Sequence, residues 1–309
     1  MSFRQAHSTF PSYLLRALLA GFVWLSVNSK TRLEATHSLQ NLGLHQVVKV
    51  KEKHWGIKGG YQLKLHGRSS PFFNNEPIPD KAKSLVMANS AYLNGFVGNH
   101  WFAGGMMRYS TGLSYTRTNH LEDTIDFIDH DSQTAFLQAS YFNSSNWIAR
   151  FGLNTARLVT LQDNLTQFTE FSPMLSLAKV FQPNASHYLT INWNWDYSFT
   201  DSPEYPGTLW TDDRLNHWST GLKLQHSWLF FQNFSLDSFT GVSFHDYSRG
   251  INSDRQDTAF SAGTSVEWAF LRFFTVAGYA EVLSRHSTIG TYSFTNWDGG
   301  LKFNASFGF

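Results

Sequence analysis

The stretch YLTINWNWDYSF, residues 188–199, alternates apolar and polar side chains almost without a break. One set of alternate positions carries Leu189, Ile191, Trp193, Trp195, Tyr197 and Phe199, and the other carries Tyr188, Thr190, Asn192, Asn194, Asp196 and Ser198. Successive side chains of a β-strand point to opposite faces of the sheet. The period of two therefore predicts a strand with one apolar and one polar face.

The same alternation recurs through most of the chain, most clearly at 217–228 and 259–270. It predicts twelve strands, of which the second has the weakest pattern, at residues 60–67, 85–95, 100–117, 133–143, 146–159, 165–182, 186–199, 215–230, 233–247, 257–270, 273–285 and 293–309.

The connections between these strands alternate in length. The short ones are 97–100, 143–146, 182–186, 231–233 and 271–272, and the longer polar ones are 68–84, 118–132, 200–214, 248–256 and 286–292. Residues 160–164 form the one short connection where a long one is due. Membrane barrels have short turns at one end and longer loops at the other. The pattern thus predicts an all-β fold, a transmembrane antiparallel up-and-down barrel of about twelve strands.

A soluble sandwich or lipocalin would carry its apolar face inward instead. The polar face argues against this alternative, because it is rich in Gly and Ser and the whole chain is only 15% charged. A soluble surface carries more Lys and Glu. Aromatic residues also gather at the strand ends, as they do at membrane interfaces. We therefore expect the apolar faces to contact hydrocarbon.

The composition excludes several functional classes. The 309-residue chain has a formal net charge of +1 and no basic run, so no nucleic-acid partner is expected. It contains no cysteine, which excludes disulfides, thiolate metal sites and thiol nucleophiles. No residue pattern indicates a cofactor.

The first residues have the composition of a signal peptide. Arg4 and Arg16 precede the apolar run 17–27, and small or polar residues follow it. A single membrane anchor is the alternative, but a spanning helix needs roughly 20 apolar residues. We expect residues 1–29 to be a cleaved signal peptide, 30–57 a periplasmic leader or plug segment, and 58–309 the barrel.

The chain ends on an alternating strand, GGLKFNASFGF, in which Gly300 precedes the alternate apolar positions Leu301, Phe303, Ala305, Phe307 and Phe309. In this it resembles the outer-membrane β-barrel proteins of Gram-negative bacteria, without matching a subfamily. The resemblance implies that this strand is the signal read by the barrel-assembly machinery and that it closes the sheet against the first strand. It also implies outer-membrane lipids and lipopolysaccharide as partners.

The polar faces supply the side chains expected inside such a barrel. They are Lys64, Arg108, Gln138, Arg150, Glu170, Asp196, Lys223, Asp237, Glu267, Glu281, Asp298 and Lys302. Both signs are present, which fits either a narrow channel with a transverse field or a set of ion pairs that closes the lumen. Inward Gly and Ser residues are expected to leave space, which favours a channel for small polar solutes or ions.

One predicted loop is a weak candidate for a metal site. It carries Glu122, Asp123, Asp126, Asp129 and Asp131. Carboxylate oxygens bind Ca²⁺, but the spacing does not match the helix-loop-helix calcium site and its glycine is missing. The alternative is a solvated external loop that attracts cations to the mouth of the barrel.

A lipid hydrolase is the enzymatic alternative, because twelve-stranded outer-membrane phospholipases are similar in size. Their Ser-Asn-Gly run is absent here. Most candidate pairs are immediate neighbours, which point to opposite faces: His226–Ser227, His245–Asp246 and His286–Ser287. His217 and Ser219 share the predicted inward face, with no evident third group. We predict no catalytic site. A structural or adhesive barrel with a closed lumen is the third possibility.

Overall fold

The computed structural model describes residues 55–69, 72–73, 76–77, 84–121, 129–162, 166–201, 215–231, 233–271 and 273–308. The expected signal peptide, residues 1–29, and residues 30–54 lie outside this part of the chain. The first strand begins at Trp55, slightly before the barrel boundary expected at residue 58.

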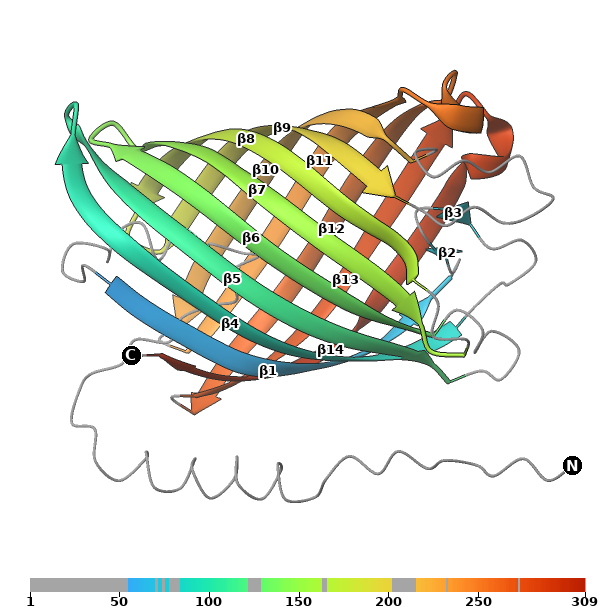
Figure 1. Ribbon diagram of the computed structural model, residues 1–309. Coiled ribbons are helices and arrows are strands. Elements are labelled where there is room, and N and C mark those ends of the chain that lie inside the picture. Colours follow the sequence, from blue (N-terminus) through green and yellow to red (C-terminus); the bar gives the residue numbers. More distant parts are fainter. Residues whose placement is uncertain are drawn as a thin grey trace, which may run out of the picture. The chain divides into compact units, whose positions relative to one another are not determined.

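Twelve long strands form one closed antiparallel barrel. They are β1 (Trp55–Arg68), β4 (Ser84–Phe102), β5 (Gly105–His120), β6 (His130–Asn143), β7 (Trp147–Thr160), β8 (Thr166–Asn184), β9 (His187–Asp201), β10 (His217–Phe231), β11 (Phe234–Tyr247), β12 (Gln256–Leu271), β13 (Phe274–Ser287) and β14 (Phe294–Gly308). Each strand pairs with its neighbours in sequence, and β14 returns to pair with β1 (Figure 1). The predicted up-and-down barrel is confirmed.

Four small elements lie in three of the longer connections. β2 (Phe72–Phe73) and β3 (Glu76–Pro77) pair with each other between β1 and β4. The short helices η4 (Gly250–Asn252) and η5 (Gly290–Tyr292) lie between β11 and β12 and between β13 and β14. None of these elements was predicted. All three connections are at the same end of the barrel, because consecutive strands run in opposite directions.

The turn predicted at 97–100 is wrong. β4 continues to Phe102, and the chain reverses at Ala103 and Gly104, which have positive φ angles of 48° and 78°. The register between β4 and β5 instead shifts between Gly98 and His100, a β-bulge. Gly98 has a φ angle of 140°, and a Cβ atom there would lie 2.8 Å from Arg108 Cα. A glycine is therefore required at this position by the β-bulge and not by a turn.

Large apolar side chains cover the outside of the barrel. Trp55, Phe151 and Trp297 are each at least 60% exposed. The buried set, in contrast, is mainly polar and includes Asp257 at 0% and Ser140 at 2%. This distribution inverts that of a water-soluble domain and suits a barrel surrounded by hydrocarbon. Among the described residues, no helix is long and apolar enough to cross a bilayer.

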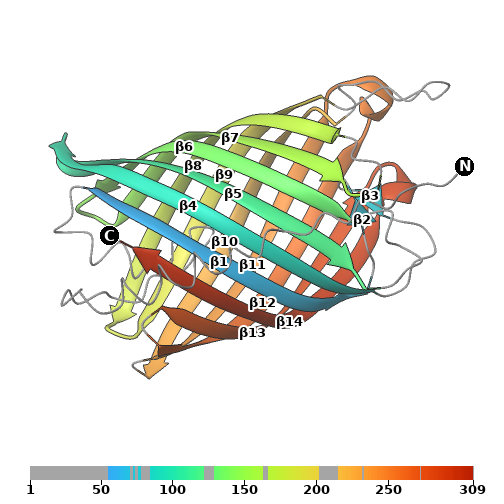
Figure 2. The ribbon, with the colours of Figure 1, turned by 60° about the horizontal axis from the view of Figure 1, so that its bottom comes forward.

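The C-terminal strand closes the barrel. β14 lies beside β1 and pairs with it along most of its length (Figure 2). Gly300 lies opposite His66. Leu301, Phe303 and Phe307 of the predicted assembly signal lie on the outer face and are 38–47% exposed. Phe309 lies outside the described residues. A Cβ atom at Gly300 would come within 2.0 Å of the Leu65 carbonyl oxygen, so the two strands can approach only at a glycine.

Replacing Gly300 by alanine should destabilise this seam by about 3 kcal/mol, the upper end of the usual cost of overpacking, because the clash is with backbone. The free energy of unfolding in detergent, followed by tryptophan fluorescence in a denaturant titration, measures the effect. Gly278→Ala is the matched control, because its Cβ would meet only Leu301 Cδ2 at 3.9 Å. Equal stability of the two variants would contradict the close approach.

Candidate functional site

The inner wall of the barrel carries the candidate site. Directly paired residues of an antiparallel sheet share a face, and the pairing Arg108–Ser140–Arg150–Ser176 defines one inward row across β5 to β8. The registers place all the charges expected inward on this face, together with Gln138. The charged members are Lys64, Arg108, Arg150, Glu170, Asp196, Lys223, Asp237, Glu267, Glu281, Asp298 and Lys302.

Two arginines lie close together on one side of this wall. Arg108 on β5 and Arg150 on β7 flank β6, whereas Asp237 on β11 and Glu267 on β12 belong to the half of the sheet around β12. In the circular strand order, β6 and β12 are diametrically opposite. All four residues lie within the first or last few positions of their strands at the short-turn end. Near that end, Arg108 and Arg150 therefore face a part of the wall with charges of both signs, because Lys58 of β1 and Lys302 of β14 share the inner face with Asp237 and Glu267.

A buried carboxylate cluster lies nearer the end with the longer loops. Asp298 Oδ1 is 2.8 Å from His66 Nδ1, and Arg68 Nε donates to Asp298 Oδ2 at 3.1 Å. The Tyr279 hydroxyl also donates to Asp298, and Lys64 Nζ lies 3.6 Å from it. The Asp298 side chain is only 5% exposed. Its charge is thus satisfied entirely by protein groups, as a buried carboxylate requires.

Aromatic rings on the inner face were missed by the sequence analysis. Phe136 lies over Gly112 and Phe239 over Gly263, where an added Cβ would come within 2.4 Å and 2.7 Å of the rings. These two inward glycines therefore do not leave empty space, because rings from neighbouring strands fill it. The expectation of free volume is wrong at these two positions. The signal was present, because residues 136–137 are two consecutive apolar residues that break the alternation.

These inward rings also hold inward cations. Lys223 Nζ lies 4.2 Å from the centroid of Phe239, and Lys302 Nζ lies 4.0 Å from that of Tyr279. The guanidinium carbon of Arg108 is 4.2 Å from the centroid of Phe96. Such contacts fix the positions of long basic side chains without neutralising their charge. The lumen thus presents positioned cations as well as ion pairs.

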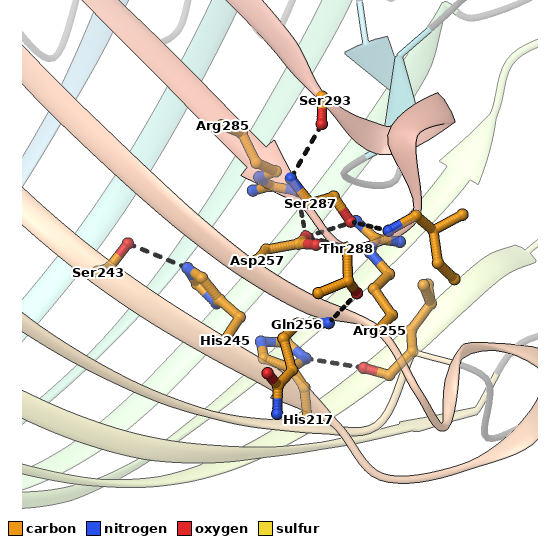
Figure 3. A network of polar contacts seen from close by, with 12 residues as sticks. His217, Ser243, His245, Arg255, Gln256, Asp257, Arg285, Ser287, Thr288 and Ser293 are labelled. Atoms are coloured by element: carbon orange, nitrogen blue, oxygen red, sulfur yellow. Dashed lines mark hydrogen bonds and ion pairs between the residues drawn. The ribbon is translucent and has the colours of Figure 1, made fainter.

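A second network, also unpredicted, joins a long connection to the wall. Asp257 and Arg255 are both fully buried, and Arg255 donates to Asp257 from Nη2 at 2.7 Å (Figure 3). Arg285 Nη1 lies 3.7 Å from the same carboxylate. The Arg255 guanidinium carbon is 3.7 Å from the Tyr292 ring centroid and 4.3 Å from that of Tyr247. These contacts hold the β11–β12 and β13–β14 connections together at the mouth.

The candidate metal loop is described only in part. Glu122, Asp123 and Asp126 lie outside the described residues. Asp129 accepts hydrogen bonds from the His120 backbone and Asn119, and Asp131 accepts two from Arg117. Protein donors therefore occupy both described carboxylates. Within the described residues, no group of three or more His, Asp or Glu side chains is placed to hold a metal ion.

The serine and histidine pairs have a different arrangement from the expected one. Ser219 donates to Asp196 Oδ1 at 2.6 Å, and His217 Nδ1 lies 2.8 Å from the Leu215 carbonyl oxygen. Ser243 Oγ lies 3.1 Å from His245 Nε2, a pair two residues apart on the inner face that the sequence analysis did not consider (Figure 3). The described residues show no hydrogen bond to the other ring nitrogen of His245. A third group that would orient the ring, as general-base activation requires, is not among these contacts.

Asp298→Asn should lower the free energy of unfolding by about 3–5 kcal/mol, because it leaves buried cations without their counterion. Denaturant titration of the purified protein in detergent measures the change. Asp131→Asn is the control, since its partner Arg117 is 45% exposed and an exposed pair contributes about 0–1 kcal/mol. A similar small loss in both variants would show that the Asp298 cluster is hydrated and not structural.

No family model and no curated protein matches this chain. Similar solved structures are outer-membrane β-barrel proteins. The β domain of the Bordetella autotransporter BrkA has a TM-score of 0.48 at 11% identity and covers 82% of this chain and 99% of its own. An outer-membrane channel from Pseudomonas putida F1 has a TM-score of 0.49 at 11% identity and covers 83% of this chain and 97% of its own. The NalP translocator domain from Neisseria meningitidis has a TM-score of 0.44 at 9% identity and covers 98% of this chain and 100% of its own. The likeness is one of barrel architecture.

Proposed function

We propose that this barrel lies in a Gram-negative outer membrane and forms a narrow, water-filled passage for small polar solutes. The observation that carries the proposal is an inner face with charged side chains of both signs, inside a closed barrel whose outer face is apolar. Charges on opposite walls of a narrow lumen orient polar solutes and lower the cost of removing their hydration water.

Partial solvent exposure of the inner wall supports a hydrated lumen. Lys64, Lys223 and Gln138 are all half-buried even though they point inward, so water-sized space reaches them. These residues belong to strands β1, β10 and β6, spread around the barrel. Charged side chains inside a barrel must be paired or hydrated, and hydration requires space that a small solute can share.

The proposal extends to assembly and location. The alternating strand β14, with Phe303 and Phe307 facing outward, serves as the segment read by the barrel-assembly machinery. Arg117 and Arg157 project from the outer face at the end with the longer loops, where Arg157 is exposed. Guanidinium groups suit the phosphates of outer-leaflet lipids such as lipopolysaccharide.

Planar-bilayer recording of the purified protein tests the passage. We expect stepwise ionic currents, and we expect Phe239→Ala to increase the current per step because its ring fills the space over Gly263 inside the lumen. Phe260→Ala, which removes an outward ring that is 60% exposed, should leave the current unchanged. Folded protein that inserts into the bilayer without any current steps would contradict the proposal.

A closed structural barrel is the second candidate. The rings packed over inward glycines and the fully buried Arg255–Asp257 pair favour it, because both fill and rigidify the interior. The two candidates differ in the current measurement. In a closed barrel the phenyl rings serve only as packing, so Phe239→Ala would reduce stability and produce no ionic current.

A further inference from the structure

The inner wall contains one arginine whose charge the protein does not satisfy. Arg150 points inward from β7, and its Nε atom is buried without a hydrogen-bond partner. Among the described residues, no ion pair, hydrogen bond or ring contact involves this guanidinium group. This contrasts with Asp298 and Asp257, each of which is surrounded by protein donors.

The surroundings of Arg150 make an unsatisfied charge costly. On the same strand and face, Ile148 is 2% exposed and belongs to an apolar cluster with Ala178, Val180 and Tyr188. Apolar surroundings strengthen electrostatic interactions and penalise an uncompensated ion by several kcal/mol. Only water or a mobile anion that enters from the lumen can compensate this cation.

The neighbouring side chains suit an anion better than a cation. Ser140 and Ser176 pair directly with Arg150 on either side, and Ser140 separates it from Arg108 on the next strand but one. Gln138 donates to Ser140 Oγ at 2.7 Å, which leaves the Ser140 hydroxyl hydrogen able to donate to a ligand. The backbones of Arg108 and Arg150 lie about 10 Å apart, two strand spacings, so an anion between them is attracted by both.

We propose that Arg150, with Ser140 and Arg108, forms an oxyanion-binding site in the lumen, and that the solute carries a carboxylate or phosphate group. A guanidinium group binds either anion through two parallel N–H···O hydrogen bonds, and a serine hydroxyl adds a third. This inference rests on the proposed passage for its role in transport, since it names the chemical class of the solute. The binding itself requires only that the lumen be open to anions.

Thermal unfolding of the purified protein in detergent tests the site, with sodium phosphate or sodium acetate replacing sodium chloride at constant ionic strength. We expect either oxyanion to raise the Tm of the wild-type protein, because a ligand that binds only the folded state stabilises it. The Arg150→Gln variant should lose this rise. The larger rise, with phosphate or with acetate, identifies the preferred anion.

Arg249→Gln is the control, because Arg249 is an exposed arginine in the β11–β12 connection and belongs to neither the lumen wall nor the outer lipid-facing surface described above. It should keep the full anion-dependent rise. In chloride alone, Arg150→Gln should unfold at the same temperature as the wild type or higher, since it removes a partly buried charge that no protein group compensates. A purely structural arginine would give the opposite result. Arg150→Lys, which retains the charge without the paired donors, should need at least a tenfold higher anion concentration for half its effect.

The proposed site would be contradicted if the anions still raised the Tm of Arg150→Gln, or if they did not raise the Tm of the wild-type protein. These outcomes are distinguishable from failure of the passage. A barrel that shows the rise but no current retains the anion site and loses the transport role. A barrel that conducts but shows no rise retains the passage, and Arg150 is then compensated by water alone.

Discussion

The need to satisfy every backbone hydrogen bond away from water determines this fold. Hydrocarbon offers no partner for a free strand edge, so a sheet whose outer face is apolar must close on itself. Closure depends on the seam between β1 and β14, where eleven consecutive residue pairs run from Lys58–Gly308 to Arg68–Asp298. Gly300 permits the closest approach in this seam. The same strand therefore completes the sheet and carries the apolar C-terminal pattern.

Closure also decides where the polar side chains go. With alternate residues committed to the apolar outside, every polar residue between them points into the lumen, where it must be paired or hydrated. The barrel meets this demand in three ways: carboxylates ringed by donors, as at Asp298; cations over aromatic rings, as at Lys223; and serine hydroxyls bonded to carboxylates, as at Ser219. Its buried residues are accordingly mainly polar, the inverse of a soluble core.

Alternation in the sequence was sufficient to predict the strands, their number and which charged residues share one face of the sheet, because a period of two leaves each residue only one of two faces. It was insufficient where tertiary packing overrides the pattern. Gly98 looks like a turn residue but forms a bulge, since only the paired strand reveals the register shift. Phe136 points inward because a glycine on the adjacent strand leaves room for its ring, and strand alignment was unknown from sequence. Arg255 lies outside any alternating segment, so nothing linked it to Asp257.

The degree of internal compensation differs along the lumen, and this difference bears on function. Toward the longer loops, the Asp298 and Asp257 clusters use protein groups to satisfy their charges, so they contribute rigidity and little affinity for a passing solute. Toward the short turns, Arg150 has no such partner among the described residues. A solute gains electrostatic binding energy only where the wall carries a charge that no protein group compensates. The selectivity of a passage through this barrel is therefore expected to be set near the short turns, by Arg108 and Arg150, and not by the acidic residues of the external loops.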